Sequence, residues 1–249
     1  MTEILTLMTA KGGSGKTTIA RGLLGAASSQ GLKVGFVDTD KTENTYSWAR
    51  RAYDRGHWDR AIEAYHTTDP RQLKSMCDDF LIDADLDLVI VDTPGDASAI
   101  HETMLGLSDL ILCPINLTAE AVNTAVRTAN FHYRQRVKVA EDEIACFRVV
   151  INRMQTTMAR PYRRQLERVL EEPLMGDGSD PPAERLPLLE TRIKDRAAYA
   201  EIEDEGLLDR IIAAKSSATE RIGVRHLVTA RDEMAALLGE CRSIMKEAR

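Results

Sequence analysis

Short apolar runs alternate with amphipathic segments along most of the chain. Five of these runs have the length and composition of strands that are buried on both faces of a sheet. The predicted strands cover residues 3–9, 33–37, 86–92, 110–114 and 145–151. Helical periodicity predicts helices at residues 16–29, 43–55, 69–82, 101–107, 118–136, 160–171, 195–205, 207–214 and 220–247. The alternation predicts a doubly wound α/β fold, in which helices flank a mostly parallel sheet.

Two further stretches have weaker patterns. Residues 61–66 are expected to form a short extended segment, and residues 186–189 a last strand at one edge of the sheet. Residues 173–183 are rich in Gly, Pro and Asp, which is typical of a surface loop. No internal repeat or linker divides the 249 residues, of which 43% are apolar. We therefore predict one domain over residues 1–249, with the terminal helix, about 220–247, packed on it.

A glycine-rich stretch lies between the first predicted strand and the first predicted helix. From Ala10 to Thr17 it fits the phosphate-binding pattern G-x-x-x-x-G-K-[ST], except that Ala10 replaces the first glycine. In such a loop, backbone N–H groups converge on phosphate oxygens, and the helix dipole adds positive potential. Lys16 is expected to reach the β- and γ-phosphates, and the Thr17 hydroxyl to bind Mg²⁺. The alternative, a flexible loop with two lysines, does not account for the flanking strand and helix.

Three carboxylates follow predicted strands at the edge of the sheet where this loop lies. Asp92 ends the strand 86–92 and matches a Walker B acid, which holds Mg²⁺ through water. Asp38 and Asp40 follow the second strand, and two residues of spacing place them on the same face. Hydrolysis needs a polarised water in line with the γ-phosphorus, and Asp40 is our candidate for positioning it. For any one of these acids, a helix cap or a turn is the alternative role.

Composition and charge limit the other classes of function. The net charge is −6, which excludes a uniformly basic coat for nucleic acid but not a local basic face. The four cysteines are scattered without a C-x-x-C pair, and the five histidines show no metal spacing, so no disulfide or structural zinc is expected. No apolar run approaches the ~20 residues of a membrane-spanning helix. We therefore expect a cytosolic protein without stable membrane insertion.

The glycine-rich stretch is more specific than a general phosphate-binding loop. Its sequence K-G-G-S-G-K-T-T resembles the deviant Walker A loop of the ParA/MinD family of ATPases. The resemblance implies a P-loop NTPase fold that binds ATP and Mg²⁺. It also implies a homodimer formed with ATP, in which Lys11 reaches across the interface to the partner's nucleotide. The nucleotide-binding residues of the loop are then Lys11, Gly12, Gly13, Ser14, Gly15, Lys16, Thr17 and Thr18.

The strand-end acids take their family roles from the same resemblance. In ParA-like proteins an Asp-x-Asp sequence follows the second strand. By this resemblance Asp38 supports the metal ion and the signature lysine, and Asp40 orients the attacking water. The chain departs from the family after these acids, because Lys41-Thr42 stands where Pro-Gln often follows.

Later segments resemble the family as well. Asn152 and Arg153 follow a strand, as does the family's adenine-reading Asn-Arg pair; an edge Asn and a surface Arg are the alternative. Thr93-Pro94-Gly95 resembles a switch II segment that senses the γ-phosphate, although a plain turn explains it equally well. Residues 191–199 resemble a segment that closes over the base and contributes to the dimer.

Arginines gather on two of the predicted helices. Those on the helix 160–171 share a face by their i, i+3 and i+4 spacing. Arginine suits phosphate contacts, and the family resemblance implies non-specific binding to DNA. The alternative is a solvated helical face, on which the glutamates of the same helix pair with the arginines. The candidates for DNA contact are Arg160, Arg163, Arg164, Arg168, Arg221 and Arg225.

Within the family, the resemblance is greatest to short plasmid partition ATPases and to VirC-type proteins of T-DNA transfer. It implies a slow, partner-stimulated ATPase switch that positions plasmid DNA or a DNA–protein complex. The expected partner is a DNA-bound adaptor or a relaxosome-type protein, and the expected location is cytoplasmic, at the nucleoid or a pole. Two alternatives remain: a MinD-like ATPase that positions itself on membranes, and a metabolic ATP-dependent enzyme such as a ligase or a reductase iron protein. The terminal helix lacks Trp and Phe, and the cysteines fit an iron–sulfur cluster poorly, so both are less favoured.

Overall fold

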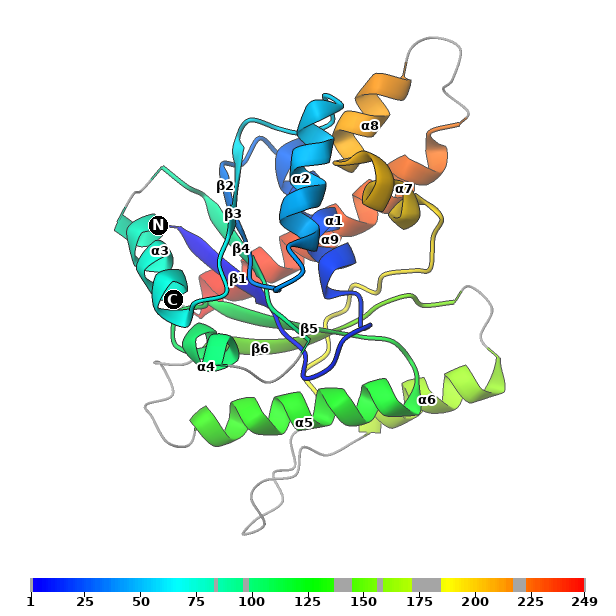
Figure 1. The fold of residues 1–249 in the computed structure, drawn as a ribbon. Helices are drawn as coiled ribbons and strands as arrows, with labels where there is room; N and C mark the ends of the chain where they lie inside the picture. The colour runs from blue at the N-terminus through cyan, green and yellow to red at the C-terminus, as the bar shows by residue number, and fades with distance from the viewer. Residues whose placement is uncertain are drawn as a thin grey trace.

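The structure, a computed structural model, describes residues 2–82, 85–95, 99–136, 145–155, 159–171, 185–216 and 223–248. These residues form a six-stranded, all-parallel sheet between two layers of helices (Figure 1). The strand order is β3-β2-β4-β1-β5-β6, which confirms the predicted doubly wound fold. The strands are β1 (Glu3–Leu7), β2 (Val34–Asp38), β3 (Ile62–His66), β4 (Leu88–Asp92), β5 (Leu110–Ile115) and β6 (Cys146–Ile151).

The helices divide between the two faces of the sheet, and each face has its own apolar core. One face packs against α1 (Lys16–Ser29), α2 (Asn44–Asp54), α7 (Ala198–Glu205), α8 (Leu208–Lys215) and α9 (Arg225–Glu247). The other face packs against α3 (Pro70–Ile82), α4 (Ala99–Leu105), α5 (Ala119–Arg136) and α6 (Arg160–Glu171). Strands β1, β2, β4 and β5 are buried along their whole length, because helices cover them on both sides.

Most predicted elements are present, and α1 and α6 have the predicted bounds. Helix α3 begins at Pro70, one residue after the predicted start, and the Asp69 carboxylate caps it by accepting the N–H of Arg71 at 2.8 Å. The prediction of a strand at residues 186–189 is wrong. Only an isolated bridge joins Leu188 to Val149 of β6, and Pro187 has no N–H with which to extend a ladder. The expected loop 173–183 lies outside the described residues.

The terminal helix packs on the domain as expected. α9 starts at Arg225, later than predicted, and residues 217–222 before it lie outside the described ranges. Its apolar stripe, from Leu227 to Met245, is buried against the core that also contains α1. Near its end, Arg242 forms an ion pair with the buried Glu3 of β1. Of the helices within the described residues, none has the length and apolar character needed to cross a bilayer.

Because all six strands are parallel, their carboxyl ends meet at one edge of the sheet. The loops after β1, β2, β4, β5 and β6 converge there. This edge therefore brings together residues 10–18, 38–40, 92–95 and 152–153, which are far apart in the sequence.

Candidate functional site

The loop between β1 and α1 has the backbone geometry of a phosphate cradle. Gly13 and Gly15 have φ values of +84° and +91°, a left-handed conformation that side chains with a Cβ rarely adopt. Gly15 immediately precedes α1, so the N–H groups of the first helical turn point toward the loop. A cavity of about 260 Å³ lies against this loop. The chain thus presents N–H donors and a helix N-terminus to one open cavity, and this arrangement is suited to phosphate groups.

Lys16 is held at the floor of this cavity. It is only 7% exposed, and its Nζ donates a hydrogen bond to Thr9 Oγ1 at 3.1 Å. The cavity is also lined by Thr17, Asp40, Thr93, Gly95 and Arg153. The structure therefore brings together the predicted phosphate-binding lysine, the predicted water-positioning carboxylate and Arg153, which was also predicted to bind the nucleotide.

Asp92 and Thr17 form the candidate magnesium site. Thr17 Oγ1 donates to Asp92 Oδ2 at 2.9 Å, while the buried Asp92 Oδ1 has no hydrogen-bond partner among the described residues. Burial raises the pKa of Asp92 to about 7, and the hydrogen bond from Thr17 only partly opposes it. An unsatisfied buried carboxylate oxygen beside a hydroxyl fits Mg²⁺, which prefers oxygen ligands and water. These two residues therefore suit the expected metal ion.

Asp38 is the last residue of β2, where the sequence predicts it, and its carboxylate binds backbone N–H groups. Its carboxylate accepts the backbone N–H groups of Thr45, at 2.9 Å, and of Tyr46, at 3.1 Å, in the first turn of α2. It also accepts the N–H of Asp40 at 3.1 Å, and it is buried. Asp38 thus caps α2, the alternative role considered for a strand-end acid. Its hydrogen bonds go to these N–H groups and none of them involves Thr17, so its part in metal binding stays a prediction.

Asp40 lies in the loop between β2 and α2 and faces the phosphate cavity. Its Oδ1 accepts two hydrogen bonds from Thr42, one from the N–H at 2.9 Å and one from the hydroxyl at 2.7 Å. Burial raises the pKa of Asp40, but these hydrogen bonds and the nearby charges of Lys16 and His66 outweigh burial and lower it overall. The carboxylate is therefore ionised at neutral pH and can accept a hydrogen bond from water. Thr42, which is part of the departure from the family pattern, orients this carboxylate through its two hydrogen bonds.

Asn152 packs on the phosphate-binding loop, and Arg153 lines the phosphate cavity. The Asn152 amide donates to the Ser14 carbonyl at 3.0 Å, and its oxygen accepts the N–H of Arg153 at 2.9 Å. A Cβ on Gly15 would come within 2.0 Å of the Asn152 Nδ2, so this amide is packed directly on the loop. Arg153 has φ +51° and lines the phosphate cavity. Both residues thus contact the phosphate end of the site, and their reading of adenine stays a prediction.

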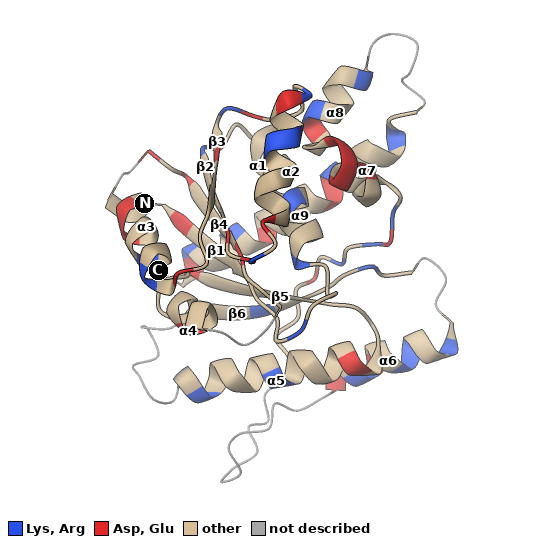
Figure 2. Ribbon diagram, viewed as in Figure 1, with Lys and Arg blue, Asp and Glu red and all other residues tan. Residues whose placement is uncertain are grey.

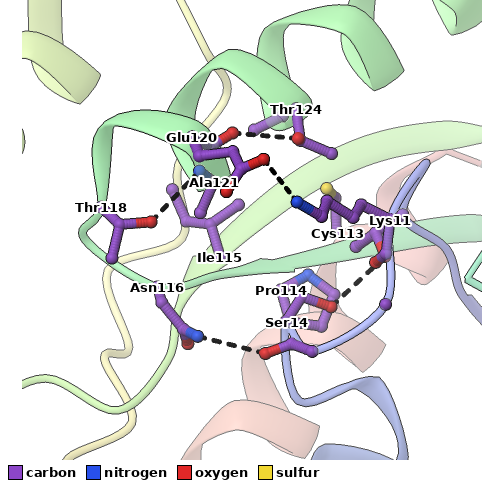
Figure 3. A pocket seen from close by; sticks show the side chains of 14 residues that line it. Lys11, Ser14, Cys113, Pro114, Ile115, Asn116, Thr118, Glu120, Ala121 and Thr124 are labelled. Carbon is purple, nitrogen blue, oxygen red and sulfur yellow. Dashed lines mark hydrogen bonds and ion pairs between the residues drawn. The ribbon is translucent and has the colours of Figure 1, made fainter.

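Lys11 points away from the phosphate cavity. Its ammonium forms an ion pair with Glu120, at the start of α5 (Figure 3). The two side chains are 52% and 70% exposed, and a second cavity of about 180 Å³ lies beneath them, between the loop and the end of β5. The hydrogen bond from Lys11 lowers the pKa of Glu120. Lys11 is therefore accessible on the outer side of the loop, as a residue that acts on a second molecule must be.

Gly95 fixes the segment after β4 to the phosphate-binding loop. A Cβ on Gly95 would lie 2.7 Å from the Gly12 nitrogen and 2.8 Å from its Cα, both of which are backbone atoms. Thr93 donates its hydroxyl hydrogen to the Leu7 carbonyl at 2.7 Å, and the buried His101 contacts Thr93 Oγ1 at 3.1 Å. Residues 93–95 are thus part of the site. A plain turn would not require the backbone of Gly95 to lie this close to the backbone of Gly12.

The variant Gly95→Ala is expected to weaken nucleotide binding at least about tenfold, since the added methyl must push the loop and this segment apart. Binding of a fluorescent ATP analogue measures the effect. Gly106→Ala is the matched control, because a Cβ there meets nothing within 4 Å. Equal affinities in the two variants would contradict the proposed contact.

The candidate DNA-contact arginines fall on opposite faces of the sheet. Arg160, Arg163 and Arg164 are exposed on α6, while Arg168 is half-buried and donates to Asn123 of α5 at 2.7 Å. Figure 2 shows these basic positions along α6. Arg225 starts α9, which packs on the other face, and Arg221 lies outside the described residues. Among the described arginines, Arg225 therefore lies on a different face of the sheet from those of α6.

Three residues of this region were not among the predicted site residues. Glu120 pairs with Lys11, His101 supports the segment after β4, and His66 donates from Nε2 to the Asp40 carbonyl at 3.1 Å. Glu120 and His66 lie 109 and 26 residues from the groups that they contact, and His101 lies 8 residues from Thr93. No short motif therefore marks them, and only the fold brings them to the site.

Comparison with known proteins agrees with this geometry. The profile of the VirC1 protein family matches residues 2–247. Protein virC1 of Rhizobium rhizogenes is 25% identical over 236 residues, which cover 94% of this chain and 95% of that protein. The MinD cell division protein of Aquifex aeolicus has the same fold, with a TM-score of 0.65, 16% identity, and coverage of 96% of this chain and 98% of that one. A plasmid partition protein of Borrelia burgdorferi, solved with bound AMPPNP, gives a TM-score of 0.60 at 16% identity, covering 96% and 99% of the two chains. The expected relation to VirC-type proteins and the ParA/MinD-type fold are confirmed, and the chain belongs to the VirC1 protein family.

Proposed function

We propose that this chain, working as one domain over residues 1–249, is a Mg-ATP-dependent ATPase switch that dimerises and acts on DNA. The observation that carries the proposal is the phosphate cavity, which Lys16, Thr17 and the ionised Asp40 line, with the buried Asp92 hydrogen-bonded to Thr17. The fold shared with the AMPPNP-bound partition protein supports a nucleotide as the ligand. Membership of the VirC1 family supports a role in DNA transfer or partition.

Each residue has a role that follows from its place. The N–H groups of residues 12–18 and Lys16 bind the phosphates and offset their negative charge. Thr17 and, through water, Asp92 hold Mg²⁺, which when bound would further neutralise the phosphate oxygens. Asp40 accepts a hydrogen bond from the attacking water and orients it toward the γ-phosphorus. Arg153, which lines the same cavity, adds positive charge near the phosphates.

The proposed dimer uses Lys11. In this chain Lys11 is paired with Glu120 on the outer side of the loop (Figure 3). Its ammonium therefore does not enter the phosphate cavity of the same chain. On association it would leave Glu120 for the partner's nucleotide. The exposed arginines of α6 would then contact DNA phosphates, and two copies would double their number. A DNA-bound adaptor or relaxosome-type protein would stimulate hydrolysis and release.

The variant Glu120→Gln is expected to tighten ATP-dependent dimerisation about three- to fivefold, because it removes an exposed ion pair that holds Lys11 away from the partner. Sedimentation velocity with ATP measures the dimer constant. Glu102→Gln, on an exposed acid of α4, controls for the loss of one charge. If both variants dimerise equally, the Lys11–Glu120 pair does not restrain the dimer.

The deciding experiment measures duplex DNA binding with ATP, with ADP and without nucleotide, at two salt concentrations. Binding that needs ATP and weakens steeply with salt is expected, since several phosphates are neutralised at once. The charge-removing variant Arg160→Ala/Arg163→Ala/Arg164→Ala should weaken binding, while its ATP affinity should stay unchanged. ATP hydrolysis that ignores DNA but requires a small acid substrate would instead indicate a ligase. Co-sedimentation with liposomes tests the membrane alternative, which the burial of the apolar stripe of α9 disfavours.

A further inference from the structure

A groove runs along the outer edge of the sheet, on the side away from α6. β3 is the end strand of the sheet, and α2 and α3 flank it on opposite faces (Figure 1). The groove has a volume of about 770 Å³, larger than that of the phosphate cavity. Tyr46 of α2 forms one wall, Met76 and Phe80 of α3 form the other, and Tyr65 and His66 of β3 lie at its base. We call this space the edge groove.

The base of the edge groove is a strand with an open edge. β3 pairs with β2 through its odd-numbered residues, since Ala61 accepts from Val34 at 2.9 Å and Thr67 donates to Asp38 at 3.1 Å. The alternation turns the N–H and C=O groups of Ala64 and His66 outward. Within the described ranges, no further strand pairs with this side of β3. Such an edge is a template on which another extended segment can add as a strand.

The described charged residues that line the edge groove are all acidic. Two exposed carboxylates, Glu43 and Asp79, line it from its two walls, and the described lining contains no Lys or Arg. Glu63 of β3 is also exposed beside it. A second copy of this chain is a poor occupant, because β3–β3 pairing would bring these carboxylates together. A segment that alternates apolar residues with Lys or Arg would instead match both the tyrosine and methionine walls and the acids.

We infer that the edge groove binds an extended segment of a partner protein, rich in Lys or Arg, that adds as a strand to the free edge of β3. The groove also touches the proposed catalytic loop. His66 donates to the Asp40 carbonyl at 3.1 Å from Nε2, and its Nδ1 lies 3.7 Å from Glu43. A segment docked on His66 and Glu43 therefore bears directly on the loop that positions Asp40. This link to hydrolysis rests on the proposed function, whereas the docking itself does not.

Binding of a fluorescein-labelled decapeptide, in which arginine alternates with valine, tests the docking by anisotropy on the full chain without nucleotide. The wild type is expected to bind it at least about tenfold more tightly than a peptide with glutamate for arginine, or one with three prolines for valines. Glu43→Lys/Asp79→Lys should lose about tenfold in affinity, and Ala64→Pro should do the same by removing an outward N–H. Glu171→Lys/Glu190→Lys, which reverses two exposed acids on other elements, is the charge-matched control.

If Glu43→Lys/Asp79→Lys and Glu171→Lys/Glu190→Lys weaken peptide binding equally, the inference is overturned. The peptide would then be attracted by the overall negative charge and not by the edge groove. Equal binding of the proline peptide would overturn strand addition. Glu43→Lys/Asp79→Lys changes only exposed residues, so it decides the matter even if Ala64→Pro unfolds. The peptide is further expected to change the ATPase rate of the wild type and not that of Glu43→Lys/Asp79→Lys. Docking without a change in rate would contradict the link to Asp40, and absence of any ATPase activity would contradict the proposed function while leaving the anisotropy result intact.

Discussion

Replacing Lys11 by alanine is expected to lower the ATP-dependent dimer constant at least about 100-fold, with ATP binding to the monomer nearly unchanged. In the single chain Lys11 is half-exposed, and its surface pair with Glu120 contributes little to stability. In the proposed dimer the same ammonium would be desolvated against the partner's phosphates, where a charge-assisted contact is much stronger. Sedimentation velocity with ATP, in an Asp40→Ala background that slows hydrolysis, measures the loss.

Lys33→Ala is a closely matched control for this experiment. Lys33 is 53% exposed, against 52% for Lys11, and it also forms an ion pair with an exposed acid, Asp85. The control removes the same charge at a site remote from the phosphate loop. Dimerisation that survives in Lys11→Ala as it does in Lys33→Ala would refute the role of Lys11 across the interface.

The variant Asp92→Asn is expected to stabilise the protein without ligand and to abolish its stabilisation by Mg-ATP. Burial raises the pKa of Asp92 to about 7, so ionising it costs free energy in the folded state. An amide keeps an oxygen that can accept from Thr17 but carries no charge. At pH 8 the melting temperature should rise by roughly 5 °C, for a gain on the order of 2 kcal/mol. The wild type should gain stability from Mg-ATP by binding linkage, and the variant should not.

The sign of the pH dependence follows from the two pKa values of this group. The folded value exceeds the unfolded value of about 3.9, so the folded state binds more protons between these limits. The free energy of unfolding of the wild type therefore falls as the pH rises from about 4 to about 7. Above pH 7 Asp92 is ionised in both states, and stability no longer changes on its account. The advantage of Asp92→Asn should be large at pH 8 and small at pH 4 to 5 in thermal melts. Asp204→Asn, at an exposed site, should show no such trend; an equal effect in both variants would contradict the account.

The sequence information that predicts the phosphate-binding loop is local. The glycines, Lys16 and Thr17 lie within eight residues, and the spacing alone implies a strand, a loop and a helix around them. Asp40 and Asp92 are predictable because parallel strands end at one edge of the sheet. The helix bounds of α1 and α6 follow from periodicity and turn residues, which are equally local.

The contacts that join remote segments could not be predicted in this way. The carboxylate of Asp38 has the same spacing whether it faces a metal ion or caps α2, and only the path of the loop decides. Asn152 packs on the loop at Gly15 because β6 ends beside it. The arginines of α6 and Arg225 lie on opposite faces of the sheet, because α6 and α9 pack on different sides of it. Their shared positive charge in the sequence does not indicate this.

The position of α9 has a consequence for how the protein is made. During synthesis β1 emerges from the ribosome before α9, yet its Glu3 pairs with Arg242 of α9, and the core over α1 is completed only by α9. Until α9 has been synthesised, the phosphate loop borders an open apolar surface on the nascent chain. The nucleotide site should therefore mature late, and the unfinished chain should be a client of chaperones during translation.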